Sequence, residues 1–396
     1  MRTTLALTRR QGKRKNGILF LMSSPRPSPL PAFLALIGTI IGAGVFGVPL
    51  VFSHMGVVLG SLLFWGVALL MLSAHLLFVE LIARDHSRRR LPGYVGRVLG
   101  KRAEWVAIGS HAFHLTGVNL VYLILGGEFL ASLFSASLPG VSILQWQIMF
   151  WVAGAILAFA GLRLLAKVEA AIAWVFLTVL LIVTAAAFVQ TSSLPSMGLG
   201  IFSWTGIGVF LFAVSGLTII PEIHEIAGKH IRLTRIIVTA ASLTTAFLIW
   251  MFGLAISFAA NGRDLSSVAA VASVLPVSVA WLVPVFGLLS VSSSFYITNY
   301  DLRAMYLYDL KLSKPLSWVF GIGIPLVLLL ATTRDFFSTI DIVGGIFNAL
   351  NVVLVACAAW VVMRREKNGP AFWWRALMPF VVMALFGFII LQRLFR

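Results

Sequence analysis

The hydrophobic positions of the chain fall into eleven long apolar segments separated by short polar connections. Each segment provides the ~20 residues that a helix needs to cross the hydrocarbon core of a bilayer. The predicted spans cover residues 31–52, 57–83, 104–135, 145–162, 168–189, 204–226, 235–260, 275–300, 315–332, 338–362 and 372–392. The pattern therefore predicts an all-α polytopic membrane protein with eleven transmembrane helices.

Two of these spans are interrupted by residues that disfavour a helix. The first contains four glycines and Pro49, and the sixth has Ser215 and Gly216 in its middle with Pro221 beyond. Each glycine or proline costs a helix about 1 to 3 kcal/mol. Unwound backbone at membrane depth is tolerated where it is packed in protein or lines a cavity, so paired interruptions in two halves of a chain indicate a transporter's binding site. Close packing of small residues against a neighbouring helix is the alternative.

Composition and charge support a membrane protein. Apolar residues make up 60% of the chain and charged residues only 11%, with a mean hydropathy of +1.00, which no soluble surface matches. The net charge of +17 comes from basic patches between the spans, which indicate topology and not nucleic-acid binding. All but four of the 30 Lys and Arg lie in alternate connections, the exceptions being Arg263, Arg334, Arg393 and Arg396. This asymmetry predicts a plasma (inner) membrane protein with its amino end inside and its carboxyl end outside.

The remaining sequence offers no sign of a cofactor or metal. Residues 1–30 are predicted to be a basic cytoplasmic tail, whether or not it belongs to the native protein, and residues 31–392 one transmembrane domain. The single cysteine, Cys357, excludes an intrachain disulfide, and no Cys/His spacing resembles a metal site. No phosphate-binding Gly-x-x-x-x-Gly-Lys-Ser/Thr run occurs, so nucleotide-driven pumping is not expected.

The two interruptions carry a family resemblance. The run from Gly38 to Pro49 reads GTIIGAGVFGVP, and the sixth span contains FAVSG at 212–216 and IPE at 220–222. These motifs resemble the amino acid permeases of the amino acid-polyamine-organocation superfamily, most of all the hydroxy and aromatic amino acid permeases. The resemblance implies a LeuT-type core of two inverted five-helix repeats, about 31–189 and 204–362, with broken helices one and six. Helix eleven, about 372–392, is then peripheral.

The same resemblance implies a substrate site at the two breaks. Half-helix amino ends carry N–H groups and partial positive charge for a carboxylate, while unwound carbonyls accept from an ammonium or bind a cation. Gly42, Ala43 and Gly44 are expected to face the carboxylate. The residues expected to offer carbonyls are Phe212, Ala213, Val214 and Ser215, with Phe212 also forming an apolar wall.

Polar side chains of two other spans are candidates for the same cavity. Asn119 and Tyr122 share one arc of the third span with His111 and His114, although hydrogen bonds to neighbouring helices would also explain such residues. The eighth span carries an arc of Ser290, Ser293, Ser294, Thr298 and Asp301. By resemblance to sodium-coupled relatives, the coupling-ion ligands are Ser293, Ser294 and the carbonyls of Gly38 and Ile41. Serine bonding to its own helix is the alternative.

Ionisable residues within spans are candidates for a proton relay, because such residues are costly in a membrane. Glu80 is expected to pair with Arg84 four residues along its helix. Glu222 follows Pro221, and Asp341 shares a helix face with Gly344 and Asn348. Glu222 and Asp341 are the two proton-relay candidates.

The sequence thus predicts a secondary active transporter that carries an aromatic or apolar amino acid by symport with H+ or Na+. Its partners are the amino acid, the coupling cation and the lipid bilayer, without nucleic acid; the sequence leaves the oligomeric state open. A transporter of another small solute and a non-transporting solute sensor are the alternatives. An enzyme is not expected, because the acidic residues are few and dispersed.

Overall fold

The fold was analysed in a computed structural model, which describes residues 29–85, 89–160, 165–191, 202–263, 265–333, 335–364 and 371–395. Of the predicted tail, only residues 29 and 30 are described, and they begin the first helix. Every regular element among the described residues is a helix, so the predicted all-α class is confirmed.

The first half of the chain contains one broken span, four long helices and a short helix. These elements are α2 (Pro29–Ile40), η1 (Ala43–Gly47), α3 (Val48–Met55), α4 (Val57–Ala83), α5 (Leu91–Leu99), α6 (Lys101–Phe134), α7 (Ile143–Ala160) and α8 (Leu165–Val189).

The second half repeats this order and adds a final helix. Its elements are α9 (Trp204–Ala213), η2 (Leu217–Ile219), α10 (Ile220–Ile226), α11 (Ile231–Ala260), α12 (Val268–Ser273), α13 (Val277–Ala280), α14 (Leu282–Tyr308), α15 (Lys314–Ala331), α16 (Phe336–Ile342), η3 (Val343–Asn348), α17 (Ala349–Arg364) and α18 (Ala371–Leu394).

Eight helices of the described chain are long and apolar enough to cross a membrane, or nine if α2 and the bent continuation through η1 and α3 form one span. Two shorter apolar helices, Ile143–Leu157 and Trp174–Val189, lie where the fourth and fifth spans were predicted. The chain is therefore a multi-pass membrane protein. The predicted count of eleven stays a prediction. Over their whole length, α7 and α8 have 18 and 25 residues, which is enough to cross the hydrocarbon core.

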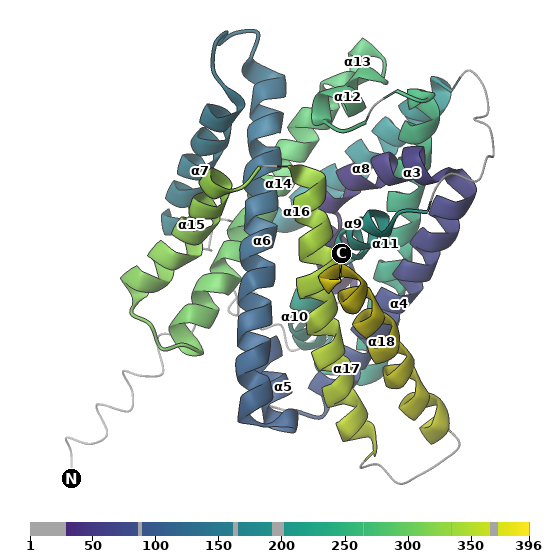
Figure 1. Cartoon of the computed structure of the whole chain (residues 1–396), viewed down its shortest axis with the longest axis vertical. Helices are drawn as coiled ribbons and strands as arrows, with labels where there is room; N and C mark the ends of the chain where they lie inside the picture. The colour runs from purple at the N-terminus through teal and green to yellow at the C-terminus, as the bar shows by residue number, and fades with distance from the viewer. Residues whose placement is uncertain are drawn as a thin grey trace.

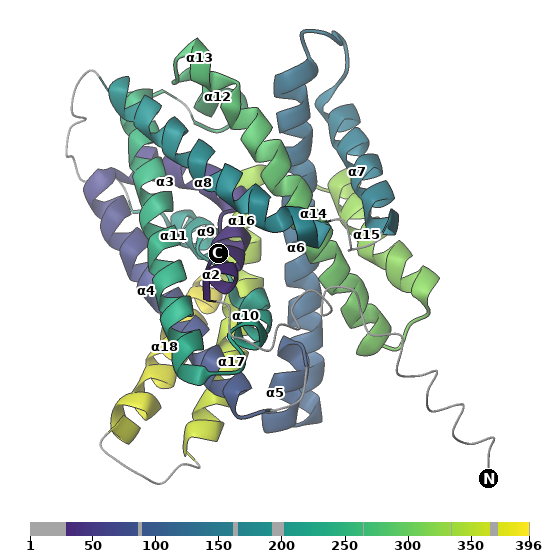
Figure 2. The ribbon, with the colours of Figure 1, turned by 180° about the vertical axis from the view of Figure 1, so that it is seen from behind.

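The longest helix among the described elements is α6, which stands upright at the front of Figure 1, with α7 and α15 to its left and α16 and α17 to its right. The short α5 lies beside its lower end, and α12 and α13 lie near its upper end. Seen from behind, α8 lies across α11 and α14 (Figure 2). The broken elements lie between these outer helices, so the interruptions in the sequence are central in the fold.

Both prolines of the interrupted spans begin new helix segments. Pro49 stands at the start of α3, and Pro221 at the start of α10. Proline is accepted in the first turn because the N–H that it lacks would have no partner within the helix. Each proline therefore fixes where the second half of its span begins.

The expected ion pair between Glu80 and Arg84 is present, at 2.7 Å. The structure adds a second partner that the helix spacing does not reveal, because Arg235 of α11 also binds the Glu80 carboxylate. This carboxylate therefore joins two helices, and its burial is explained without a transport role.

The last helix is tied into the centre by a buried ion pair. Arg393, near the end of α18, pairs with Asp341 of α16 and donates to the carbonyl of Trp204 at the start of α9. The side chains of Arg393 and Asp341 are only 10% and 9% exposed. Helix eleven, which the family resemblance places at the periphery, thus contributes a charge that two inner helices depend on. Arg393 is one of the four basic residues that do not fit the charge asymmetry, and the structure places it in a helix, paired with Asp341.

We expect Arg393→Met to lower the free energy of unfolding by about 3–5 kcal/mol, because it leaves the Asp341 carboxylate buried without its partner. Thermal and denaturant unfolding of the purified protein measure the effect. A double variant with Asp341→Asn removes both charges and is expected to recover most of the loss. Arg364→Met, at an exposed arginine on the Trp360 ring, is the matched control and should change little. Wild-type stability of Arg393→Met would contradict the role of the pair.

Candidate functional site

The first span unwinds between α2 and η1, at Ile41 and Gly42. Its two parts meet at an angle of 46°. The chain turns tightly here, since the Gly42 N–H donates to the Ile40 carbonyl at 2.9 Å. The Ile41 carbonyl, freed from the helix ladder, accepts from the Ser290 hydroxyl of α14 at 3.4 Å. The break thus leaves backbone groups that side chains of other helices satisfy.

The two breaks touch each other through their backbones. A Cβ atom built on Gly44 would lie 2.5 Å from the Ala213 Cα and 3.0 Å from both the Ala213 nitrogen and the Phe212 ring. No side chain fits in such a gap. Glycine at position 44 is therefore what allows η1 and the end of α9 to meet at this distance.

The sixth-span break is held on one side by η3, which belongs to the tenth predicted span. Asn348, at the end of the π-helical segment η3, donates to the Leu211 carbonyl at 3.4 Å, and its Oδ1 accepts from the Ser215 hydroxyl at 3.2 Å. Gly344 of η3 lies against the Gly208 backbone of α9. The sequence placed Asp341, Gly344 and Asn348 on one face, and all three do contact the sixth span.

The other side of this break is held by α4. The Gly216 N–H donates to His75 Nε2 at 3.1 Å, and His75 is fully buried. The broken backbone therefore has polar partners from two helices, as the absence of water in a membrane interior requires.

A cavity of about 50 Å³ lies beside the two breaks. Space of this size holds only one or two water molecules. Its lining comes from α2, α6, α8, η2 and α14, and consists of Gly38, Thr39, Leu115, Tyr122, Phe176, Thr218, Ser293, Ser294, Ile297, Thr298 and Asp301. Six of these side chains bear hydroxyl groups, so the cavity presents hydrogen-bond donors and acceptors beside the apolar side chains of Leu115, Phe176 and Ile297.

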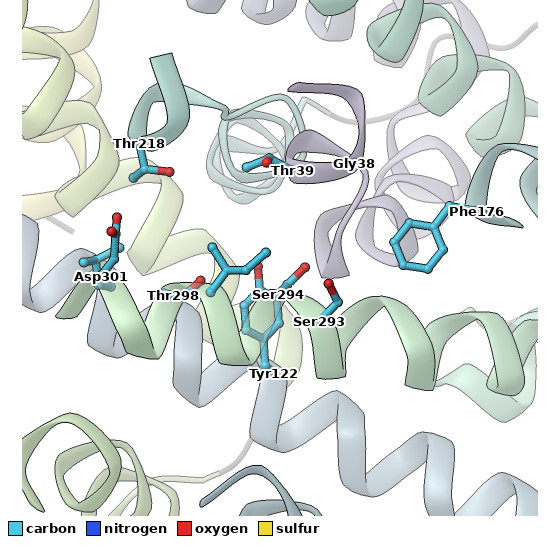
Figure 3. A pocket seen from close by; sticks show the side chains of 11 residues that line it. Gly38, Thr39, Tyr122, Phe176, Thr218, Ser293, Ser294, Thr298 and Asp301 are labelled. Carbon is cyan, nitrogen blue, oxygen red and sulfur yellow. The ribbon is translucent and has the colours of Figure 1, made fainter. Parts of the chain in front are cut away.

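The hydroxyl groups converge on Tyr122. Ser293, Ser294, Thr298 and Asp301 follow one another along α14, and Tyr122 reaches toward them from α6 (Figure 3). A Cβ on Gly42 would lie 3.6 Å from the Tyr122 hydroxyl and 3.9 Å from that of Ser294. Gly42 therefore stands next to the hydroxyl groups of Tyr122 and Ser294 without crowding them.

An ion pair closes the cavity at the Asp301 end. Asp301 pairs with Arg90, which immediately precedes α5, and their side chains are 17% and 26% exposed. Arg90 also interacts electrostatically with Glu222 of α10 and with Asp309. Burial raises the pKa of the Asp309 carboxyl, and the positive charge of Arg90 opposes that rise. The positive charge of Arg90 is therefore shared among several acidic groups at this end of the bundle.

Aromatic rings fill the space on the η1 side of the breaks. Phe46 of η1 packs edge-on against Phe129 and Phe252, with ring centroids 5.1 and 6.3 Å apart, and lies 6.0 Å from the Phe286 ring. Phe286 in turn packs on Phe176, which lines the cavity. The cavity is thus bounded by rings on one side and by an ion pair on the other.

The structure brings only some of the predicted site residues to the cavity. Of the substrate candidates, Tyr122 lines it and Gly42 lies beside Tyr122. The other backbone candidates of both breaks are buried behind the cavity, namely Ala43, Gly44, Phe212, Ala213 and Val214. Ser215 is occupied by Asn348. Asn119 is fully buried outside the lining, and its amide finds no hydrogen-bond partner among the described residues.

Three of the four coupling-ion candidates share the cavity, namely Gly38, Ser293 and Ser294. The fourth, Ile41, offers its carbonyl to Ser290 instead. The proton-relay candidates lie apart from each other: Asp341 is paired with Arg393, whereas Glu222 has a buried carboxylate oxygen without a hydrogen-bond partner among the described residues.

Thr298 and Asp301, which the sequence placed on the polar arc of the eighth span, line the cavity. Three other lining residues were not named from the sequence, namely Thr39, Phe176 and Thr218; Thr39 adjoins Gly38, so helical spacing points to it. Phe176 and Thr218 carry no comparable signal, because only the packing of α8 and η2 brings them there.

No group of three or more His, Cys, Asp or Glu side chains that could hold a metal ion occurs in the part of the chain that the structure describes.

Comparison with known proteins decides the family. Residues 26–394 match the family model described as transmembrane amino acid transporter protein. The chain belongs to this family. It is therefore a transporter and not an enzyme, as the sequence predicted. The finer likeness to hydroxy and aromatic amino acid permeases stays a prediction, and a search of curated proteins gives no match.

Solved structures share the transporter's fold. MhsT in complex with L-phenylalanine matches with a TM-score of 0.69 at 16% identity, covering 92% of this chain and 98% of MhsT. Mhp1, a nucleobase-cation-symport-1 family transporter in a closed conformation with bromovinylhydantoin bound, matches with a TM-score of 0.63 at 14% identity, covering 92% and 91%. The predicted LeuT-type fold is thereby confirmed.

We expect Gly44→Ala to destabilise the transporter by about 1–3 kcal/mol, because the added methyl group meets the Ala213 backbone, which cannot rotate away. Gly66→Ala is the matched control, since nothing lies within 4 Å of a Cβ at that position of α4. Thermal unfolding of both purified variants measures the difference. Equal stability of the two variants would show that the breaks do not meet as closely as described.

Proposed function

We propose that this chain is a secondary active transporter that moves an amino acid by symport with a cation through alternating access. The observation that carries the proposal is the meeting of two unwound spans beside a hydroxyl-lined cavity. Broken helices at the interface of two repeats supply both partial charges that a zwitterion needs. Membership of an amino acid transporter family supports the same class of solute.

The amino acid carboxylate is proposed to approach the first break. The N–H groups of Ala43 and Gly44 stand at the start of the segment that runs on through α3, where partial positive charge favours an anion. The Gly42 N–H is bonded to the Ile40 carbonyl in this conformation, so Gly42 contributes open space beside the carboxylate. The ammonium group is proposed to meet carbonyl oxygens at the end of α9, within residues 212–215. Tyr122 offers a hydroxyl group next to Gly42.

An aromatic or apolar side chain is the proposed substrate class. Phe176 on the lining and Phe212 beside Gly44 offer apolar contact, and the structurally similar MhsT holds L-phenylalanine. The cavity of about 50 Å³ is smaller than such a substrate. Binding therefore requires α14 and α6 to draw away from the first span, which fits the rocking of one helix bundle against the other.

The coupling cation is proposed to be H+ or Na+. Hydroxyl groups and carbonyls, as offered by Gly38, Ser293 and Ser294, are suitable oxygen ligands for Na+. Glu222, with a buried carboxylate oxygen close to the charge of Arg90, is the better placed proton candidate. Asp341 is less suited, because Arg393 already balances its charge.

The proposal is tested by uptake of labelled tryptophan, tyrosine and a panel of other amino acids into proteoliposomes, with imposed pH and sodium gradients in parallel. Accumulation driven by one gradient supports symport and names the ion together with the substrate class. Accumulation under neither gradient, in protein shown to be folded, contradicts the proposal and favours another solute or a sensor.

We expect Gly42→Ala to fold normally but to weaken substrate affinity about tenfold or more, a loss of about 1.4 kcal/mol. The added methyl group has room, at 3.6 Å from the Tyr122 hydroxyl, yet it occupies the space where the carboxylate is proposed to bind. The KM of uptake and thermal unfolding of the same preparation separate the two effects. Unchanged KM in the folded variant would place the substrate elsewhere.

A further inference from the structure

His75 is a buried histidine that bridges two helices at the sixth-span break. Its ring lies on α4 with no exposed surface. Nε2 accepts from the Gly216 N–H at 3.1 Å, and Nδ1 lies 3.2 Å from the Ser242 hydroxyl of α11. Gly216 immediately precedes η2, which contributes Thr218 to the cavity lining. The imidazole is thus bonded to the backbone that links the sixth-span break to the cavity.

The partners of His75 define its protonation state. A backbone N–H can only donate, so Nε2 must be unprotonated to accept from Gly216. The proton of the neutral ring is then on Nδ1, where it can be donated to the Ser242 oxygen. An imidazolium ion has donors on both nitrogens and cannot accept from Gly216. This arrangement is therefore available only to the neutral ring.

The charged side chain nearest to His75 along α4 is paired. Glu80, five residues along α4, binds Arg84 and Arg235. The other ionisable residues of the described elements that contact α4 are His54 on α3, Glu222, His224 and Glu225 on α10, Arg232 on α11, Cys357 and Arg364 on α17, and Arg393 on α18. The elements η2 and α9 contribute none. Gly216 and Ser242 are thus the groups that lie within hydrogen-bonding distance of the His75 ring.

We propose that His75 couples protonation to the conformation of the sixth-span break. The neutral ring holds the Gly216 N–H in the arrangement seen here. A proton that binds Nε2 from water converts the acceptor into a donor, and the Gly216 N–H must then find another partner. Acidification therefore favours conformations in which η2 has moved away from α4. The effect of protonation on η2 is independent of the proposed transport function. An effect on transport rests on that function, because it requires that the movement of η2 opens or closes the cavity.

Hydrogen exchange at the Gly216 amide tests the coupling without any substrate. Exchange is followed in lipid nanodiscs from pH 8 down to the most acidic pH at which the protein stays folded, because burial disfavours the charged form of an imidazole, and is corrected for the intrinsic effect of pH. We expect wild-type protection to fall about fivefold on acidification, the effect of losing one hydrogen bond. His75→Gln retains an acceptor and a donor but cannot titrate, so its protection should not depend on pH.

His224→Gln is the matched control. His224 bonds to Thr234 at 2.9 Å and does not contact Gly216, so this variant should keep the pH dependence of the wild type. If protection of the Gly216 amide is independent of pH in the wild type, or equally dependent in His75→Gln, the coupling is wrong. Nitrogen-15 spectra of histidine side chains in the wild type provide a second test, which needs no variant. A His75 proton on Nε2 at neutral pH would also overturn the proposal.

Uptake measurements separate this inference from the proposed function. If transport occurs and His75→Gln flattens its pH profile while His224→Gln does not, both are supported. If transport occurs with the same pH profile in all three proteins, His75 coupling is wrong and the transport function stands. If no amino acid is transported, the proposed function fails, and the exchange measurement still decides the coupling.

Discussion

The close approach of two unwound backbones at Gly44 and Ala213 is the constraint on which the rest of the site depends. Each break exposes N–H and C=O groups that a helix would have satisfied, and a membrane interior offers no water to replace those bonds. Bringing the breaks together concentrates these groups in one place. The fold must then supply partners for them and leave room for a solute, and a side chain at position 44 would prevent both.

The partners come from helices that flank the sixth span on opposite sides. Asn348 of η3 binds the chain at Leu211 and Ser215, whereas His75 of α4 binds it at Gly216. The π-helical form of η3 accompanies this contact, and such segments recur at functional sites because they shift the direction of side chains. The unwound segment therefore has a defined geometry although it lacks a regular helix.

The sequence revealed the helical class and the two breaks because glycine and proline act locally. Gly42, Gly44 and Gly216 interrupt their spans, and the prolines restart them, as backbone propensities predict. The pairing of Glu80 with Arg84 followed from helix spacing for the same reason. These features depend on neighbours within a few residues, so a single sequence is enough to find them.

The partners of those breaks were harder to predict, because they depend on how each helix is rotated and how far it slides. Ser290 and Ser293 lie three residues apart, which is nearly one turn of α14. Both therefore lie on a similar face of the helix, and its position along the first span decides that Ser290 bonds to the Ile41 carbonyl. Phe176 and Thr218 reach the cavity only through the path of α8 and η2. Arg393 is the extreme case, since it lies 52 residues from the aspartate it neutralises.

Charge balance links the cavity to the kind of solute that it suits. Among the described lining residues, Asp301 is the one carboxylate, and Arg90 neutralises it. The other polar side chains of the lining are hydroxyl groups, which donate and accept without net charge. A cavity with no net charge favours neither an anion nor a cation, but helix ends beside it can satisfy both charges of a zwitterion with about half an elementary charge each. The amino acid proposed as the substrate is the simplest solute that needs both ends at once.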